Sequence, residues 1–220
     1  MSSQLFSEIS KNLLFRYTIP LRRMELAWSG QWLVLDEGCR LPHFGQFEGQ
    51  PTYADVRGCW NQAGLFFTVV VGSKRQAAQC HVSKLLESDG VQFWVDTRDV
   101  HNVHRASRFC HWFAFLPTQG NTKAAKPLGT MLKINRAKED PKTFQGFQPR
   151  VMSELKKDGY RLAVLLPASS LSGWNPAEHR KLGFQYAVID RELGWQTLAA
   201  DFRFPIAEDP SLWQTLELVE

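Results

Sequence analysis

Short apolar segments that end at proline or glycine recur along this 220-residue chain. Residues 64–71 are rich in β-branched and aromatic side chains and lie next to glycines, residues 109–116 stop at Pro117, and residues 160–166 stop at Pro167. Segments of this length and composition, bounded by residues that break regular structure, are typical of β-strands. Because residues 64–71 are apolar on both faces, we expect that strand to be buried on both sides. Similar signals predict strands at residues 13–19, 31–35, 91–96, 184–190 and 195–204.

The spacing of these segments predicts an all-β protein. Seven or eight strands, no long helical pattern and no internal repeat favour a two-sheet antiparallel β-sandwich of the immunoglobulin-like or jelly-roll type, with long loops. One or two short helical turns are expected, one of them at Asn175, where an Asn cap precedes Pro176 and Glu178. We interpret residues 1–220 as a single domain, with N-terminal strands and an extension over residues 1–50 and a long basic excursion over residues 117–150.

Composition and charge exclude several classes of protein. The net charge of +4, from 26 basic and 22 acidic residues, is a weak bias, and no nucleic-acid-binding motif accompanies it. No run reaches 18 apolar residues, so we expect no membrane span. The N-terminal residues do not read as a secretory signal, which predicts a cytoplasmic protein with free thiols. None of the four cysteines has the two-residue spacing of a redox or zinc motif: Cys39, Cys59, Cys80 and Cys110.

Four segments occur in an order that resembles a known family. They are residues 60–67, beginning with Trp60; residues 89–96, an acidic residue, a strand and a closing Asp; residues 159–167; and residues 182–190. They resemble carbohydrate-binding module family nine, and the match extends over about residues 52–204. That family is similar to the wider sugar- or haem-binding sandwich domains related to dopamine β-monooxygenase N-terminal domains. The resemblance implies a β-sandwich that holds sugar ends between aromatic rings and contacts hydroxyls with polar side chains. It also implies structural calcium in some members and haem in relatives.

Two positions depart from the pattern of that family, and one matches it. Gln92 stands where the family usually has an acidic residue. Residues 83–88 contain no equivalent of its stacking tryptophan. Trp195, which follows the penultimate strand, matches a late aromatic residue of the family.

A sheet face that combines aromatic rings with an amide is the predicted ligand site. Side chains alternate along a strand, so Gln92 and Trp94 share one face, and a paired strand can set His111 or Trp112 beside them. Rings stack on the apolar faces of a sugar, and amides bond to its hydroxyls. The alternative is that the N-terminal segment covers Trp94. The predicted ligand-binding residues are Gln92, Trp94, Arg98, His111, Trp112, Arg191 and Trp195.

Histidines and aspartates are concentrated in residues 96–111. Imidazole together with carboxylate suits a transition metal, and carboxylate oxygens suit calcium. The candidate metal ligands are Asp96, Asp99, His101 and His104. The alternative is an ordered loop in which the two aspartates pair with arginines and the other polar groups form one cluster against the sheet. That cluster would consist of Arg98, His101, His104 and His111.

No catalytic arrangement is recognisable, so we predict no catalytic residues and a protein that is not an enzyme. The predicted function is a non-catalytic ligand-binding module for a carbohydrate or another small ligand. Two alternatives stay open. One is an interaction or assembly subunit that keeps the sandwich without a sugar site and binds a protein partner. The other is a haem- or metal-binding sandwich, for which Met24, Met131 and Met152 could supply axial ligands, although nothing fixes a pair.

Overall fold

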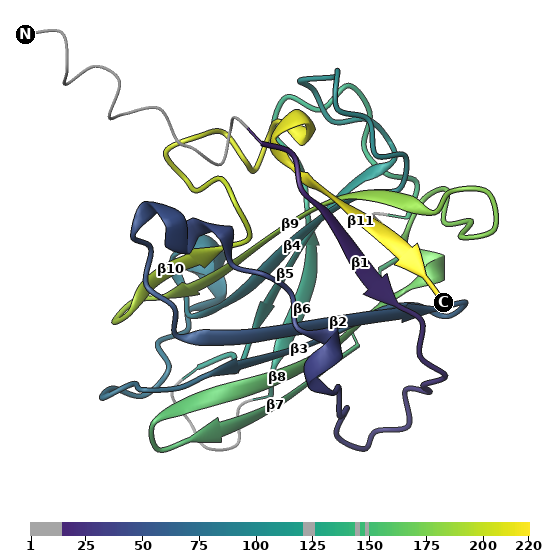
Figure 1. Ribbon diagram of the computed structural model, residues 1–220. Helices are drawn as coiled ribbons and strands as arrows, with labels where there is room; N and C mark the ends of the chain where they lie inside the picture. Colours follow the sequence, from purple (N-terminus) through teal and green to yellow (C-terminus); the bar gives the residue numbers. More distant parts are fainter. Residues whose placement is uncertain (1–14, 121–125, 144–145, 148–149) are drawn as a thin grey trace, which may run out of the picture.

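The computed structural model describes residues 15–120, 126–143, 146–147 and 150–220, and its strands form two sheets (Figure 1). In spatial order the larger sheet contains β1 (Thr18–Arg22), β11 (Gln214–Val219), β9 (Lys181–Asp190), β4 (Gly90–Asp96), β5 (Cys110–Leu116) and β6 (Leu128–Leu132), and β10 (Gly194–Thr197) also pairs with β9. The smaller sheet contains β2 (Ala54–Asn61), β3 (Gly64–Val71), β8 (Gly159–Pro167) and β7 (Arg150–Lys156). All these pairs are antiparallel except β1 with β11. The predicted all-β sandwich is confirmed.

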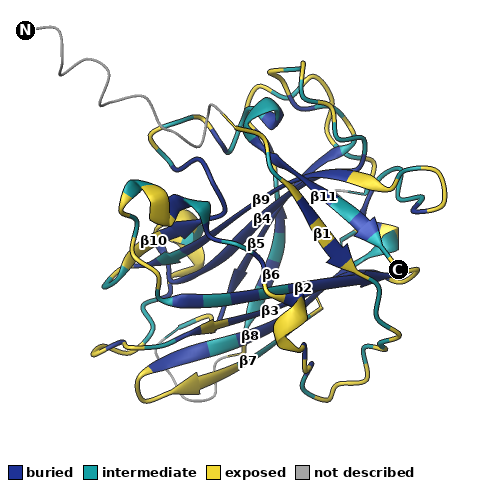
Figure 2. Ribbon diagram, viewed as in Figure 1, coloured by how far each residue is buried: buried dark blue, intermediate teal, exposed yellow. Residues whose placement is uncertain are grey.

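Aromatic side chains from both sheets meet in the core between them. Phe67 of β3 stacks on Phe93 of β4 at 4.4 Å between ring centroids and on Phe184 of β9 at 5.5 Å. Such offset ring contacts add to the free energy that comes from burying the rings. Most residues of β3, β4, β5, β8 and β9 are buried, which Figure 2 shows as dark blue strands in the middle of the molecule.

A second apolar layer covers the outer face of the smaller sheet. Leu33 and Leu35 pack with Phe66 of β3 and Leu165 of β8, so β3 is buried on both faces, as its sequence predicts. The strand predicted at residues 31–35 is wrong, because this segment forms no ladder and lies as an irregular cover over the sheet. Its apolar side chains contact the sheet without backbone pairing, a role that composition alone does not distinguish from a strand.

Several element boundaries differ from the sequence predictions. Pro20 lies inside β1 rather than ending it, which an edge strand tolerates because one side of its backbone has no partner strand. The last predicted strand ends at Thr197, and the chain then crosses the outer face of the larger sheet as a loop. The basic excursion contains β6 and the start of β7. Residues 13–14 of the first predicted strand and residues 121–125, 144–145 and 148–149 of the excursion lie outside the described residues.

The short helical elements are all of the 3-10 type within the described residues. They are η3 (Glu37–Cys39), η4 (Phe44–Glu48), η5 (Val82–Glu87), η7 (Ala168–Ser170) and η8 (Pro210–Leu212). At Asn175 the backbone forms one turn, in which the carbonyl of Asn175 accepts from the N–H groups of Glu178 at 3.2 Å and His179 at 2.8 Å. No helix among the described residues is long and apolar enough to cross a membrane.

Candidate functional site

The outer face of the larger sheet carries an aromatic pair. Trp94 of β4 lies opposite Trp112 of β5 in the strand register, and their rings stack with centroids 5.6 Å apart at 22°. The alternation of β4 sends Val91, Phe93 and Val95 into the core between the sheets, and Trp94 packs in a separate cluster with Trp112. The side chains of Gln92, Trp94 and Trp112 therefore belong to the same outward face.

A pocket of about 270 Å³ opens on this face. We call it the tryptophan pocket, and its lining residues are Leu86, Gln92, Trp112, Ile189, Trp195, Phe202 and Ala207. Trp195 is 42% exposed, and its ring meets Phe202 edge-on at 5.3 Å. The pocket thus brings together three of the seven predicted ligand-binding residues.

The amide of Gln92 has a fixed orientation in this pocket. The indole Nε1 of Trp112 donates to the Gln92 carbonyl oxygen at 3.0 Å. An indole N–H is only a donor, so the oxygen of the amide must face it. The amide nitrogen of Gln92 then remains as a donor, and no hydrogen bond from it occurs among the described residues.

The turn between β9 and β10 presents Trp195. Trp195 pairs with Ile189, so both side chains lie on the same face of this hairpin. The carboxylate of Asp190 accepts from the backbone N–H groups of Glu192 and Leu193, both at 3.0 Å. Gly194 closes the turn at φ +93°, a conformation that other residues rarely adopt.

Trp94 is fully buried and does not line the tryptophan pocket. The stacked ring of Trp112 lies on one side of it, and the edge of Phe202 approaches at 6.5 Å from the loop that follows β10. Phe202 belongs to the C-terminal part of the chain, and among the described residues no side chain from residues 15–50 joins this cluster, so the described part of the N-terminal segment does not cover Trp94. Trp94 supports the face rather than forming its surface.

His111 lies on the opposite side of the sheet from Trp112. Its Nδ1 is 3.3 Å from the carbonyl oxygen of Val95, and its Nε2 accepts from the backbone N–H of Ser172 at 2.8 Å. Burial lowers the pKa of His111 to about 4, so the ring is neutral near pH 7 with its proton on Nδ1. This inward position separates it from the tryptophan pocket.

The two predicted arginines also lie apart from the pocket. Arg98 donates to the carbonyl oxygens of Thr97 at 2.9 Å and Gly173 at 2.8 Å, and its guanidinium lies 4.2 Å from the ring centroid of Phe109. These contacts join two loops. The backbone N–H of Arg191 donates to Asp89 at 2.8 Å, while its exposed side chain is not part of the pocket lining.

The candidate metal ligands are held at three hydrogen-bonded positions. The Asp96 carboxylate accepts from the backbone N–H groups of Arg98 at 3.0 Å and Val100 at 2.9 Å, and burial raises its pKa. Asp99 lies 2.8 Å from Nε2 of His101. His104 lies 3.0 Å from Asp209, on another part of the loop.

These positions form neither a set of metal ligands nor a single hydrogen-bond network. Among the described residues, no group of three or more His, Cys, Asp or Glu side chains is arranged to hold a metal ion. The loop over residues 97–109 is ordered by hydrogen bonds. Its polar side chains, however, form separate groups: Asp99 and His101 share Thr215, while His104 contacts Asp209. The expected arginine partners of the aspartates are replaced by backbone N–H groups, a threonine and a histidine.

A buried ion cluster beneath the β9–β10 turn has no counterpart in the sequence predictions. The ammonium of Lys74 contacts Asp190 at 2.5 Å and Asp89 at 3.1 Å, and all three side chains are buried. Glu192 lies farther out, at 3.9 Å. Asp89 precedes β4 and Asp190 is the last residue of β9, and the pairing of these two strands is a signal for their proximity. Nothing in the sequence singles out Lys74.

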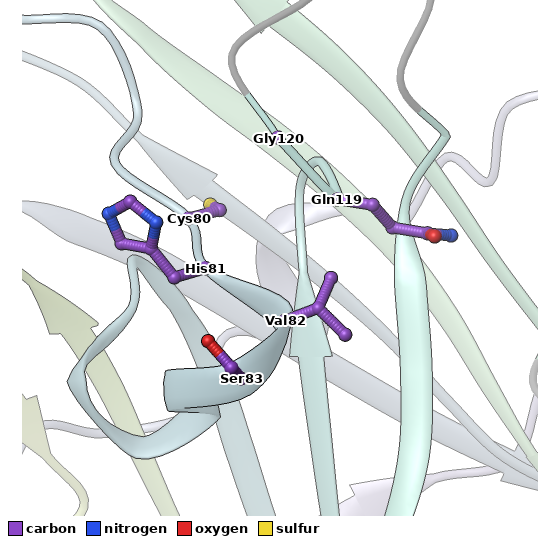
Figure 3. Close-up of a pocket in the computed structure, with 6 residues that line it drawn as sticks. All are labelled: Cys80, His81, Val82, Ser83, Gln119 and Gly120. Atoms are coloured by element: carbon purple, nitrogen blue, oxygen red, sulfur yellow. The ribbon is translucent and has the colours of Figure 1, made fainter.

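A larger hollow of about 530 Å³ lies at the start of η5 (Figure 3). Its lining residues are Cys80, His81, Val82, Ser83, Gln119 and Gly120. The Cys80 thiol donates to the carbonyl of Asp89 at 3.4 Å, and burial raises its pKa to about 12, so it is protonated near neutral pH. No Trp, Tyr or Phe side chain lines this hollow, so the tryptophan pocket is the better candidate for stacking a ligand.

Comparisons with solved structures identify proteins of similar architecture. A carbohydrate-binding module of family nine from Caldicellulosiruptor kristjanssonii, in complex with cellotriose, has a TM-score of 0.61 and 13% identity, covering 92% of this chain and 93% of that chain. The same kind of module in complex with glucose has a TM-score of 0.59 and 14% identity, covering 92% and 96%. A candidate carbohydrate-binding protein from Bacteroides uniformis has a TM-score of 0.53 and 12% identity, covering 93% and 100%.

The shared feature in these comparisons is the fold, which confirms the resemblance to the family-nine sandwich. No protein-family model matches the sequence. No curated protein matches it closely either.

Proposed function

We propose that this protein is a non-catalytic carbohydrate-binding module whose ligand occupies the tryptophan pocket. The observation that carries the proposal is the combination of Trp195, Trp112 and the Gln92 amide around one opening on the outer sheet face. The family-nine architecture supports it, because the solved modules of that fold hold cellotriose and glucose.

The side chains around the opening suit the two surfaces of a sugar ring. The half-exposed ring of Trp195 offers a flat apolar surface to the carbon–hydrogen face of a pyranose. The amide nitrogen of Gln92 can donate to a ring hydroxyl, because its carbonyl oxygen is already engaged by Trp112. Stacking supplies most of the affinity in this arrangement, and the amide orients the ligand.

The lining of the pocket supports binding without chemistry. Its seven residues include no Asp, Glu, His, Lys or Arg. Glycoside hydrolysis ordinarily uses two carboxyl groups on either side of the scissile bond. A pocket without ionisable side chains has no general acid or base to offer, so we assign it a binding role only.

A ring-deletion experiment tests the proposal. A glycan array with the intact protein would select a ligand, and calorimetry would then compare the wild type with Trp195→Ala. Loss of one stacking ring should weaken binding by about 1–3 kcal/mol, the scale of burying a large apolar side chain. Trp32→Ala is the matched control, because Trp32 packs on the outer layer of the other sheet.

The outcomes separate the proposed function from its alternatives. An unchanged dissociation constant for Trp195→Ala would remove the tryptophan pocket from the binding site. Absence of any bound glycan on the array would refute the carbohydrate assignment and favour the assembly-subunit alternative.

A further inference from the structure

The chemistry of the tryptophan pocket also indicates which kind of sugar it accepts. Six of its seven lining residues have hydrocarbon or aromatic side chains, and Gln92 is the remaining one. The oxygen of that amide accepts from Trp112 at 3.0 Å, so Gln92 offers its N–H groups to a ligand. The indole of Trp195 is likewise only a donor. The lining side chains therefore provide few hydrogen-bond partners, and those are donors.

This lining weakens the binding of a fully hydroxylated hexose. A hydroxyl moved from water into an apolar site without a hydrogen-bond partner costs binding free energy. The aliphatic part of the wall consists of Leu86, Ile189 and Ala207, which cannot bond to a hydroxyl. A methyl group in the same position loses no hydrogen bonds on leaving water, and its burial contributes the favourable transfer free energy of an apolar group.

The size of the pocket limits how much ligand it encloses. Its volume of about 270 Å³ is just below the usual range of small-molecule sites, roughly 300–1,000 Å³. One sugar ring is a suitable occupant for this space, and any further units of a glycan would lie outside it.

We propose, on the basis of the carbohydrate-binding function above, that the tryptophan pocket selects a 6-deoxyhexose unit. In such a sugar a methyl group replaces the hydroxymethyl group. The methyl group lies against the aliphatic wall formed by Leu86, Ile189 and Ala207, one face of the ring stacks on Trp195, and the Gln92 amide donates to a hydroxyl.

Two probes that differ by one hydroxyl group test this selection. Calorimetry or ligand-observed NMR with the full chain would compare methyl 6-deoxy-β-D-glucopyranoside with methyl β-D-glucopyranoside. The deoxy sugar should bind at least about tenfold more tightly, as expected when an unpartnered hydroxyl is removed.

A matched pair of variants on η5 locates the selecting wall. Leu86 lines the tryptophan pocket and is 51% exposed, whereas Val82 lines the larger hollow instead and is 48% exposed. Both positions tolerate a polar side chain because they already face water. Leu86→Gln supplies a hydrogen-bond partner for the hydroxymethyl group and should reduce the preference to less than about threefold, because one neutral hydrogen bond offsets most of a tenfold difference in affinity. Val82→Gln should leave it unchanged.

The possible outcomes distinguish failure of the deoxy-sugar selection from failure of the carbohydrate-binding function. Equal affinity for the two probes, or a preference for the glucoside, would overturn the deoxy-sugar selection and leave carbohydrate binding intact. Binding of neither probe by a protein that binds another glycan would also overturn the selection. An unchanged preference in Leu86→Gln would show that the methyl group does not contact this wall and would refute the proposed pose. A protein that binds no glycan refutes the proposed function and the selection together.

Discussion

Replacing Lys74 by methionine removes the single ammonium group from the buried ion cluster under the β9–β10 turn. The substitution keeps the length and apolar stem of the side chain, so the main change is the loss of charge and hydrogen bonds. Two buried carboxylates, Asp89 and Asp190, then lose the cation that lies 3.1 and 2.5 Å from them. Because Asp190 also shapes the turn that carries Trp195, the damage should extend to the tryptophan pocket.

The expected cost follows from the burial of the cluster. Removing one partner of a buried ion pair destabilises a protein by about 3–5 kcal/mol, because a charge is left in the interior without compensation. Lys74 compensates two such carboxylates, so we expect a value near the upper end, about 4–5 kcal/mol. That is a large share of the total stability of a typical domain, about 5–15 kcal/mol. For a chain of this length it corresponds to a fall in Tm of roughly 8–20 °C.

Urea denaturation followed by tryptophan fluorescence measures this free energy. Lys84→Met is the matched control, since Lys84 is 61% exposed and its contact with Glu87 spans 3.5 Å; such a surface pair contributes about 0–1 kcal/mol. A free energy of unfolding for Lys74→Met within 1 kcal/mol of the wild type would refute the reasoning.

The pH dependence gives an independent signature of the cluster. Burial lowers the pKa of Lys74, but the hydrogen bonds and charges of Asp190 and Asp89 outweigh it, so the net shift is upward. Because the pKa of Lys74 is higher in the folded state, its ion pair stabilises the protein fully at a pH below the unfolded-state pKa of about 10.4. This stabilisation is lost as the pH rises through the folded-state pKa. The difference in free energy of unfolding between wild type and Lys74→Met should therefore become smaller in strongly alkaline solution.

Three further predictions concern the buried His and Cys side chains and the histidine loop. His111, with its pKa lowered to about 4, should remain neutral by NMR at pH 5.5, and protonation with a midpoint near 6.5 would contradict its buried hydrogen bonds. Its contribution to the free energy of unfolding should be complete above about pH 6.5 and should fall by up to about 3 kcal/mol as the pH is lowered toward 4. All four cysteines are buried and unpaired, so a thiol reagent should react slowly with the native protein and titrate four thiols after unfolding without reductant; a count below four would disprove the free-thiol prediction. Elemental analysis after dialysis should find no stoichiometric metal, because the Asp96 carboxylate already accepts two backbone N–H groups; a metal that His101→Ala and His104→Ala remove would contradict this.

Strand positions were the most predictable part of this protein. The runs around β3, β4, β5, β8 and β9 differ from their observed bounds by no more than three residues, because they combine apolar composition with clear stops. The prediction of a strand at residues 31–35 was wrong because an apolar segment that covers a sheet has the same composition as a strand. Sequence periodicity reports burial, and it does not report backbone pairing.

The candidate site was predictable only in part, for a related reason. The alternation along β4 correctly placed Gln92 and Trp94 on one face, and the position of Trp195 after β9 pointed to the same surface. The partner strand offered both His111 and Trp112, and the register puts Trp112 opposite Trp94 and His111 opposite Val95 on the inward face. Pairing register is a property of two strands together, so neither strand encodes it alone.

The sequence by itself determined the class of fold and the two faces of its clearest strands, because β-branched and aromatic runs with a period of two have few other stable arrangements in water. Only the tertiary structure decided which part of the outer face is open. Phe202 and Ala207 come from the loop after β10, and Leu86 comes from η5, more than 100 residues away along the chain. The ion pair of Lys74 with Asp190 likewise joins positions 116 residues apart. Contacts of this kind depend on how segments pack in three dimensions, and no local pattern in the chain records them.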